Sequence, residues 1–76
     1  MNKDRRAKIQ HIIDQLEAIK EDLECIRDEE QEYYDNMPEN LQSSSRADAA
    51  EEAISNLEDA ISSIEDAIGS LEEAKA

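Results

Sequence analysis

The sequence has no tryptophan or phenylalanine, and it holds only one glycine, one proline and one cysteine among 76 residues. A β-sheet needs aromatic and β-branched residues along its strands and glycine in its turns, so this composition disfavours a sheet. The lone Cys25 cannot form an internal disulfide, which argues against a secreted, disulfide-stabilised scaffold. We therefore expect one all-α unit that spans residues 1–76.

Positive charge is also scarce, since 8 lysines and arginines face 21 acidic residues and the net charge is −13 at pH 7. Such an excess repels phosphate backbones and anionic lipids, which disfavours direct binding to nucleic acid or to a membrane surface. No apolar run approaches the ~20 residues of a membrane-spanning helix, and no signal-peptide core follows the opening MNKDRRAK. We expect a cytoplasmic protein.

Residues 51–76 repeat a seven-residue unit, EEAISNL, EDAISSI and EDAIGSL, followed by EEAKA. With Ile54 as position a of a heptad lettered a to g, apolar residues occupy the a and d positions of all three full units. Alanine fills every g position, and acids fill every e and f position. This pattern predicts a helix from about residue 46 to about residue 74, with one apolar side and one acidic side.

The first half of the chain continues the same alternation of three and four residues, which predicts a helix from about residue 3 to about residue 35. Its expected seam is Ile9, Ile12, Leu16, Ile19, Leu23, Ile26, Glu30, Tyr33 and Met37. Asn2 can cap the helix start, and Pro38 stops it. Residues 36–45 form the expected loop. Its last serines, Ser43 to Ser45, offer a cap for the second helix, and Ser45 with Asp48 approximates a capping box.

Two helices joined by such a loop predict an antiparallel coiled-coil hairpin. If the numbers of facing residues add to about 80, the apolar positions of the two helices meet along the whole seam, and Tyr33 faces Ala47. The same register brings the e-position cations of the first helix near acids of the second, in the pairs Lys20–Glu58 and Arg27–Glu51. It also places the basic first turns beside the negative C-terminal end of the second helix.

A two-helix layer leaves the flanks of both apolar stripes exposed, and chains this small usually need a disulfide, a metal or an oligomer for stability. We therefore expect two hairpins to dimerise into a four-helix bundle. The residues expected at this self-association surface are Ile13, Ala53, Ala60, Ala67 and Ala74.

The search for chemistry yields no catalytic, cofactor-binding or metal-binding residue. His11 is the only histidine, and it lacks the preceding Glu of a Glu-x-x-His di-iron motif. The acidic run of residues 28–35 lacks the glycine and the alternating ligands of a calcium loop, so a solvated surface is the simpler interpretation. Cys25 has no histidine partner that could activate it. We expect a protein that is not an enzyme and that uses no cofactor.

Two surfaces can carry recognition. The first is the hairpin tip, with Tyr33, Tyr34, Met37 and Leu41, whose residue types are typical of binding hot spots, although they can equally plug the hairpin end. The second is the acidic face, which consists of Glu52, Glu58, Asp59, Glu65, Asp66 and Glu73. Spread over a ~45 Å helix, the net charge gives one negative charge per ~3.5 Å, and side-by-side dimerisation gives one per ~1.7 Å, as in duplex DNA. This spacing permits mimicry of nucleic acid, whereas acidity is also an ordinary route to solubility.

The tip DNMPENL, the serine-rich joint and the heptads EEAISNLEDAI resemble a group of small acidic helical proteins from phages and mobile elements of Gram-positive bacteria. The resemblance covers most of the chain, and NMPENL is its specific part. It implies an inhibitor or accessory regulator without catalytic residues. Our hypothesis is a non-enzymatic module that occupies a basic, nucleic-acid-binding surface of a partner protein. The alternative is a structural or assembly module whose role is its own oligomer.

Overall fold

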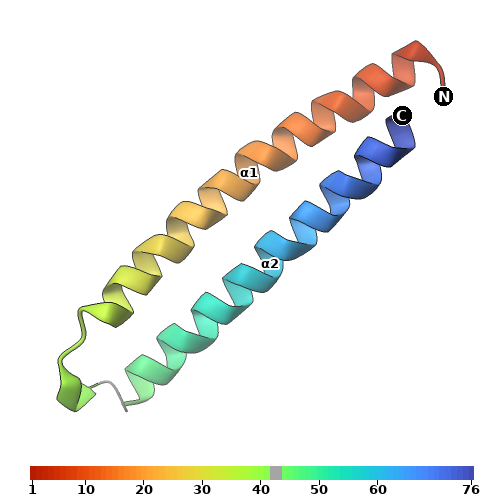
Figure 1. Cartoon of the computed structure of the whole chain (residues 1–76). Helices are drawn as coiled ribbons and strands as arrows, with labels where there is room; N and C mark the ends of the chain where they lie inside the picture. The colour runs from red at the N-terminus through yellow and green to blue at the C-terminus, as the bar shows by residue number, and fades with distance from the viewer. Residues whose placement is uncertain (42–43) are drawn as a thin grey trace.

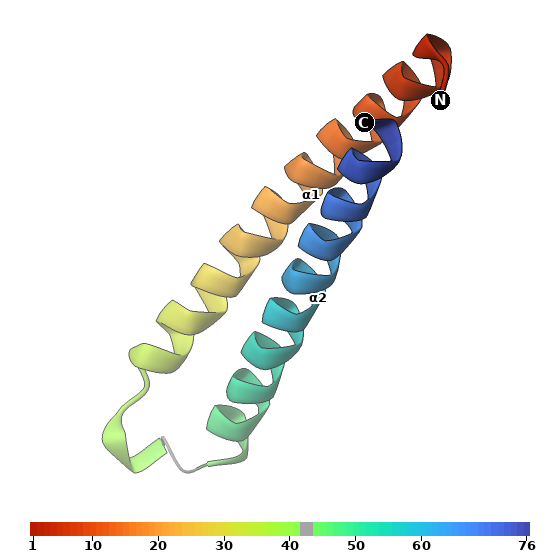
Figure 2. The same ribbon diagram turned by 45° about the vertical axis from the view of Figure 1, so that its right-hand side comes forward.

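The computed structural model describes residues 1–41 and 44–76 and forms a hairpin of two long helices. Helix α1 (Lys3–Asp35) is followed by a single 3-10 turn, η1 (Glu39–Leu41), and by helix α2 (Ser45–Lys75). The helices lie side by side and antiparallel, with the first turns of α1 projecting past the end of α2, and both chain ends lie at the same end of the hairpin (Figures 1 and 2). The molecule measures 59 × 15 × 12 Å. The prediction of an all-α antiparallel hairpin is confirmed.

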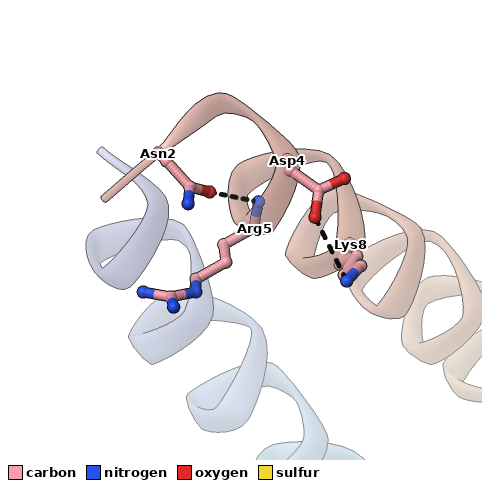
Figure 3. A network of polar contacts seen from close by, with 4 residues as sticks. All are labelled: Asn2, Asp4, Arg5 and Lys8. Carbon is pink, nitrogen blue, oxygen red and sulfur yellow. Dashed lines mark hydrogen bonds and ion pairs between the residues drawn. The ribbon is translucent and has the colours of Figure 1, made fainter.

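The start of α1 is fixed by the predicted cap. The backbone N–H of Arg5 donates a hydrogen bond of 2.8 Å to Oδ1 of Asn2, which satisfies a donor that the helix itself cannot pair (Figure 3). Asp4 in the first turn forms an ion pair of 3.1 Å with Lys8. The C-terminus lies at the same end of the hairpin (Figures 1 and 2), but no ion pair joins the two ends within residues 1–41 and 44–76.

The end of α1 also follows the prediction. The helix ends at Asp35, and the N–H of Met37 donates to the carbonyl of Tyr34 at 3.2 Å in a final turn. Pro38 comes next, and its ring disfavours a helical conformation of the preceding residue. The chain then turns through η1, where the N–H of Leu41 donates to the carbonyl of Pro38 at 2.8 Å.

The start of α2 corrects one prediction. Ser44 is the cap, since its Oγ accepts a hydrogen bond of 3.4 Å from the N–H of Ala47. Ser45 is already the first helical residue, so the capping box predicted for Ser45 and Asp48 is wrong. Ser43, the earliest of the three serines, lies outside the described residues. Local sequence offers three similar hydroxyls here, so it does not decide which of them caps the helix.

The seam of α1 differs from the predicted one in every second position. The buried and half-buried residues that form the observed seam are spaced alternately four and three residues apart. They are Ile9, Ile13, Leu16, Lys20, Leu23, Arg27, Glu30, Tyr34 and Met37. The helix is thus turned about its axis so that positions a and e, and not a and d, face α2. Ile13 is only 3% exposed between the helices, so our expectation that it lies on an open flank, available for self-association, is wrong.

Four large apolar residues consequently point away from α2. They form the outer row of α1, which consists of Ile12, Ile19, Ile26 and Tyr33, each between 45% and 49% exposed. Tyr34, rather than Tyr33, packs against α2, where it contacts the buried cluster of Met37, Ala47 and Ala50. The placement of Tyr33 in the seam opposite Ala47 is therefore wrong.

Helix α2 presents the apolar side that the heptads predict. Its a positions Ile54, Ile61 and Ile68 are buried, and its d positions are half-buried, namely Leu57, Ile64 and Leu71. Among the g-position alanines, Ala53 is half-buried, whereas Ala60, Ala67 and Ala74 are exposed. The core is thus centred on the a row of α2, and its d and g rows turn toward one open side.

The register of the hairpin is shifted from the predicted one. The Tyr34 hydroxyl donates to the carboxylate of Glu51, and Glu65 lies near enough to Lys20 to stabilise its charge, so facing residue numbers add to 85 instead of 80. The pairs predicted for this region, Lys20 with Glu58 and Arg27 with Glu51, are therefore wrong. The two cations bind neighbours on their own helix, as Lys20–Glu17 at 3.5 Å and Arg27–Asp28 at 3.1 Å. The η1 turn follows Pro38 and was not predicted from the sequence. It adds residues to the connection after Pro38, which agrees with the larger sum.

Candidate functional site

The acidic face lies on the outer side of α2. All six of its carboxylates are exposed, and so are the flanking acids Glu51 and Glu72. The ion pairs found among residues 1–41 and 44–76 all join residues of α1, so none of them neutralises a carboxylate of this face. Helix α2 supplies only two cations of its own, Arg46 and Lys75, which stand at its ends. The middle of the acidic face therefore has no ion-pair partner within the described residues.

The edge of this face nearest α1 already attracts one cation of the chain. The Lys20 side chain lies half-buried beside α2, and its pKa is raised above the ordinary lysine value, chiefly by the charge of Glu17. Glu65 of α2 raises the same pKa further. A lysine that approaches the e row of α2 is thus held more firmly in its charged form.

The charge density is lower than the sequence suggested. Thirteen net negative charges along 59 Å give one per about 4.5 Å, because the hairpin is longer than the ~45 Å expected from its helices alone. Two hairpins side by side would carry one charge per about 2.3 Å, against about 1.7 Å in duplex DNA. The hairpin as a whole therefore approaches the charge density of DNA less closely than expected.

The predicted tip residues separate into two groups. Tyr34 and Met37 pack inward on Ala47 and Ala50, so for these two the interpretation as a plug of the hairpin end is the better one. Tyr33 and Leu41 remain exposed, at 48% and 41%. They border an open cavity of about 480 Å³ lined by Glu29, Glu32, Tyr33, Asn36, Met37, Pro38, Leu41 and Arg46. The surface available for recognition at the tip is thus smaller than predicted.

The Tyr34 hydroxyl serves the hairpin itself. Its hydrogen bond to Glu51 raises the pKa of the Tyr34 phenol above its usual value, and partial burial and nearby carboxylates add to the effect. The bond ties the end of α1 to the second turn of α2. A partner could not use this hydroxyl without breaking the contact between the helices.

The outer row of α1 is the surface that sequence reasoning missed. A signal for it was present in α1, where two pairs of large side chains are adjacent, Ile12–Ile13 and Tyr33–Tyr34, and adjacent helical residues point in directions about 100° apart. Two large side chains in succession therefore do not both fit into a narrow seam. The structure turns Ile12 and Tyr33 outward, in line with Ile19 and Ile26.

The remaining candidates carry no arrangement of ligands. Within the two described segments, no group of three histidine, cysteine, aspartate or glutamate side chains is placed to hold a metal ion. Cys25 is an exposed free thiol. In the same segments, neither helix combines the length and the apolar character needed to cross a membrane.

No protein-family model, no curated protein and no solved structure matches this chain. The resemblance to small acidic proteins of phages and mobile elements therefore stays a prediction, carried by the NMPENL tip and the heptads.

Proposed function

We propose that this chain is a non-catalytic binding protein whose acidic face occupies a basic, nucleic-acid-binding surface of a partner protein. The observation that carries the proposal is the row of exposed carboxylates on α2, none of which takes part in the ion pairs of residues 1–41 and 44–76. Carboxylates form their strongest contacts in water-poor interfaces with lysine and arginine, so a basic protein surface is the matching partner. In this role the chain acts as an inhibitor or regulator.

The regular helix supports this role because it fixes the spacing of the charges before binding. The f-position carboxylates recur every seven residues, which corresponds to about 10.5 Å along a straight helix. A partner that binds such a row does not have to order a flexible segment, and binding loses less entropy. The apolar contacts with α1 hold α2 in place and do not involve the carboxylates, so the charges can be changed without changing the core.

The test replaces the four f-position acids by glutamine. The variant carries the substitutions Glu52→Gln, Asp59→Gln, Asp66→Gln and Glu73→Gln. The matched control makes the same change of charge on exposed positions of α1, with Asp14→Gln, Glu21→Gln, Asp28→Gln and Asp35→Gln. Partners are first captured from a bacterial lysate by the parent chain and eluted with salt. Affinity for the captured protein is then measured for all three chains across a salt series.

We expect the α2 variant to lose at least about tenfold in affinity while the α1 control stays within a few-fold of the parent, because short-range charge contacts decide the loss. The α2 variant should fold at least as well as the parent, since it removes repulsion between like charges. The α1 control also loses the exposed Arg27–Asp28 ion pair, but such a pair contributes at most ~1 kcal/mol, so the control should fold about as well as the parent. Equal losses in the two variants would mean that only the overall charge matters. Affinity that changes with neither salt nor substitution would refute the proposal and move attention to Tyr33 and Leu41 at the tip.

A further inference from the structure

The outer row of α1 lies on the same side of the hairpin as an uncharged side of α2. The e positions of the two helices meet on one side, as the Tyr34–Glu51 hydrogen bond shows, so the d and g positions of both helices lie on the other. The cavity at the tip confirms this placement, because Tyr33 of α1 and Arg46 of α2 line it together. The outer row and the alanine row therefore form one continuous face.

This face of α2 is free of charge although 38% of the residues in the chain are charged. Every charged residue between positions 47 and 74 stands at b, e or f, and the c, d and g positions carry none. The exposed c and g residues of this neutral side are Ala49, Asn56, Ala60, Ser63, Ala67, Ser70 and Ala74. A chain that carries a net charge of −13 thus keeps its acids off one side of α2.

The exposed area of the hairpin is large for its mass. A compact monomer of 8.6 kDa exposes about 4,700 Å², whereas this chain exposes 5513 Å². The excess is roughly 800 Å², which equals the area that each partner buries in a stable interface of standard size. The face runs the length of the paired helices in a hairpin that measures 59 × 15 × 12 Å, so it can supply an area of this order.

We propose that this face binds a second copy of the chain, in a four-helix bundle whose twofold axis runs parallel to the helices. A rotation about such an axis does not change a residue's position along the helices, so both tips lie at the same end. It also places α1 of one copy over α2 of the other. Facing residues in the hairpin add to about 85, so residues of two copies that add to about 85 lie level. The outer row then meets the alanine row in the pairs Ile12–Ala74, Ile19–Ala67, Ile26–Ala60 and Tyr33–Ala53.

All four levels of this arrangement place a large side chain over a small one, which is the complementarity that closely packed helices need. The rim fits as well, since Asp22 lies level with Ser63 and Glu29 with Asn56, an acceptor opposite a donor in each case. With the tips at opposite ends, isoleucine would face isoleucine and alanine would face alanine. The acidic face points away from the second copy, so two chains of like charge meet where α2 carries no charge.

The first test measures mass by light scattering over a range of protein concentration. The parent should reach twice its chain mass of 8.6 kDa. Ile19→Gln should raise the dissociation constant by about 100-fold, because twofold symmetry removes the apolar side chain twice. Glu21→Gln introduces the same residue on the far side of α1 and should leave the constant unchanged. Helicity should persist in both variants, because Ile19 is already half exposed in the single hairpin.

The second test fixes the arrangement by crosslinking in a Cys25→Ser background. One chain carries Ile19→Cys and another carries Ala67→Cys, and the two are mixed and oxidised. A disulfide-linked pair should form between the two different chains, whereas Ile19→Cys alone should stay uncrosslinked. Self-crosslinking of Ile19→Cys, near the middle of α1, would show that the tips lie at opposite ends and would overturn the proposed axis. A parent mass of 8.6 kDa at submillimolar concentration would overturn the dimer itself. Neither test uses the basic partner, so the dimer and the proposed function fail independently.

Discussion

The rotation of α1 can be tested on two neighbouring residues of the same type. Ile13 is 3% exposed and Ile12 is 45% exposed. Replacing a buried isoleucine by alanine lowers the free energy of unfolding by about 2–5 kcal/mol. We expect about 3 kcal/mol for Ile13→Ala, because two helices can move together and partly fill the cavity. Ile12→Ala removes a half-exposed side chain and leaves no enclosed cavity, so it should cost about 1 kcal/mol in the single hairpin.

The assay is chemical and thermal unfolding followed by circular dichroism. It is run at a concentration where light scattering reports the mass of one chain, so that the proposed dimer does not contribute. Both substitutions replace isoleucine by alanine at adjacent positions of the same helix, so both change helix propensity by the same amount. A difference of about 2 kcal/mol corresponds to melting temperatures that differ by roughly 8–16 °C in a chain of this size. Equal costs, or a larger cost for Ile12→Ala, would refute the rotation and restore the a and d seam predicted from the sequence.

Three further measurements examine the loop end. The raised pKa of Tyr34 stabilises its neutral form in the folded chain, so parent stability should fall as pH rises above about 10, where the unfolded phenol ionises first. In pH-resolved melts Tyr34→Phe should weaken this fall without abolishing it, because the raised pKa of Lys20 contributes in the same direction. Ser44→Ala should cost about 1 kcal/mol through loss of the helix cap, whereas Ser45→Ala should cost little, and the reverse order would move the start of α2. Tyr33→Ala should lower the melting temperature more as protein concentration rises, while Tyr34→Ala should lower it by the same amount at every concentration.

The element boundaries were predictable because their signals are local. Asn2 accepts the hydrogen bond that its position before the first helical turn suggests, and Pro38 follows the end of α1 as its ring requires. The predicted second helix, 46–74, differs by one residue at each end from Ser45–Lys75. The cap was misplaced because consecutive serines offer the same chemistry, and local sequence cannot choose among them.

The rotation and the register depend on tertiary contacts, which the heptads left undecided. The a row of α1 supports two stripes, one completed by Ile12 and the other by Ile13. The second stripe brings Lys20 toward Glu65, and the aliphatic stems of lysine and arginine can cover apolar surface while their charges stay in water. The predicted positions of the acidic face followed directly from the repeat. The division of the tip into buried and exposed residues did not, because it depends on that rotation.

The two proposed surfaces respond to salt in opposite directions, which gives each of them its own signature. Contacts between the acidic face and a basic partner weaken as salt screens the attraction. Association of two copies, each with a net charge of −13, should strengthen in the same series, because salt screens their mutual repulsion and leaves the apolar contact of the outer row intact. The dimer also brings two acidic faces into one particle, so a partner with two basic sites would bind it with avidity. Ile19→Gln should remove that avidity without altering the carboxylates, which separates the contribution of the dimer from that of the acidic face.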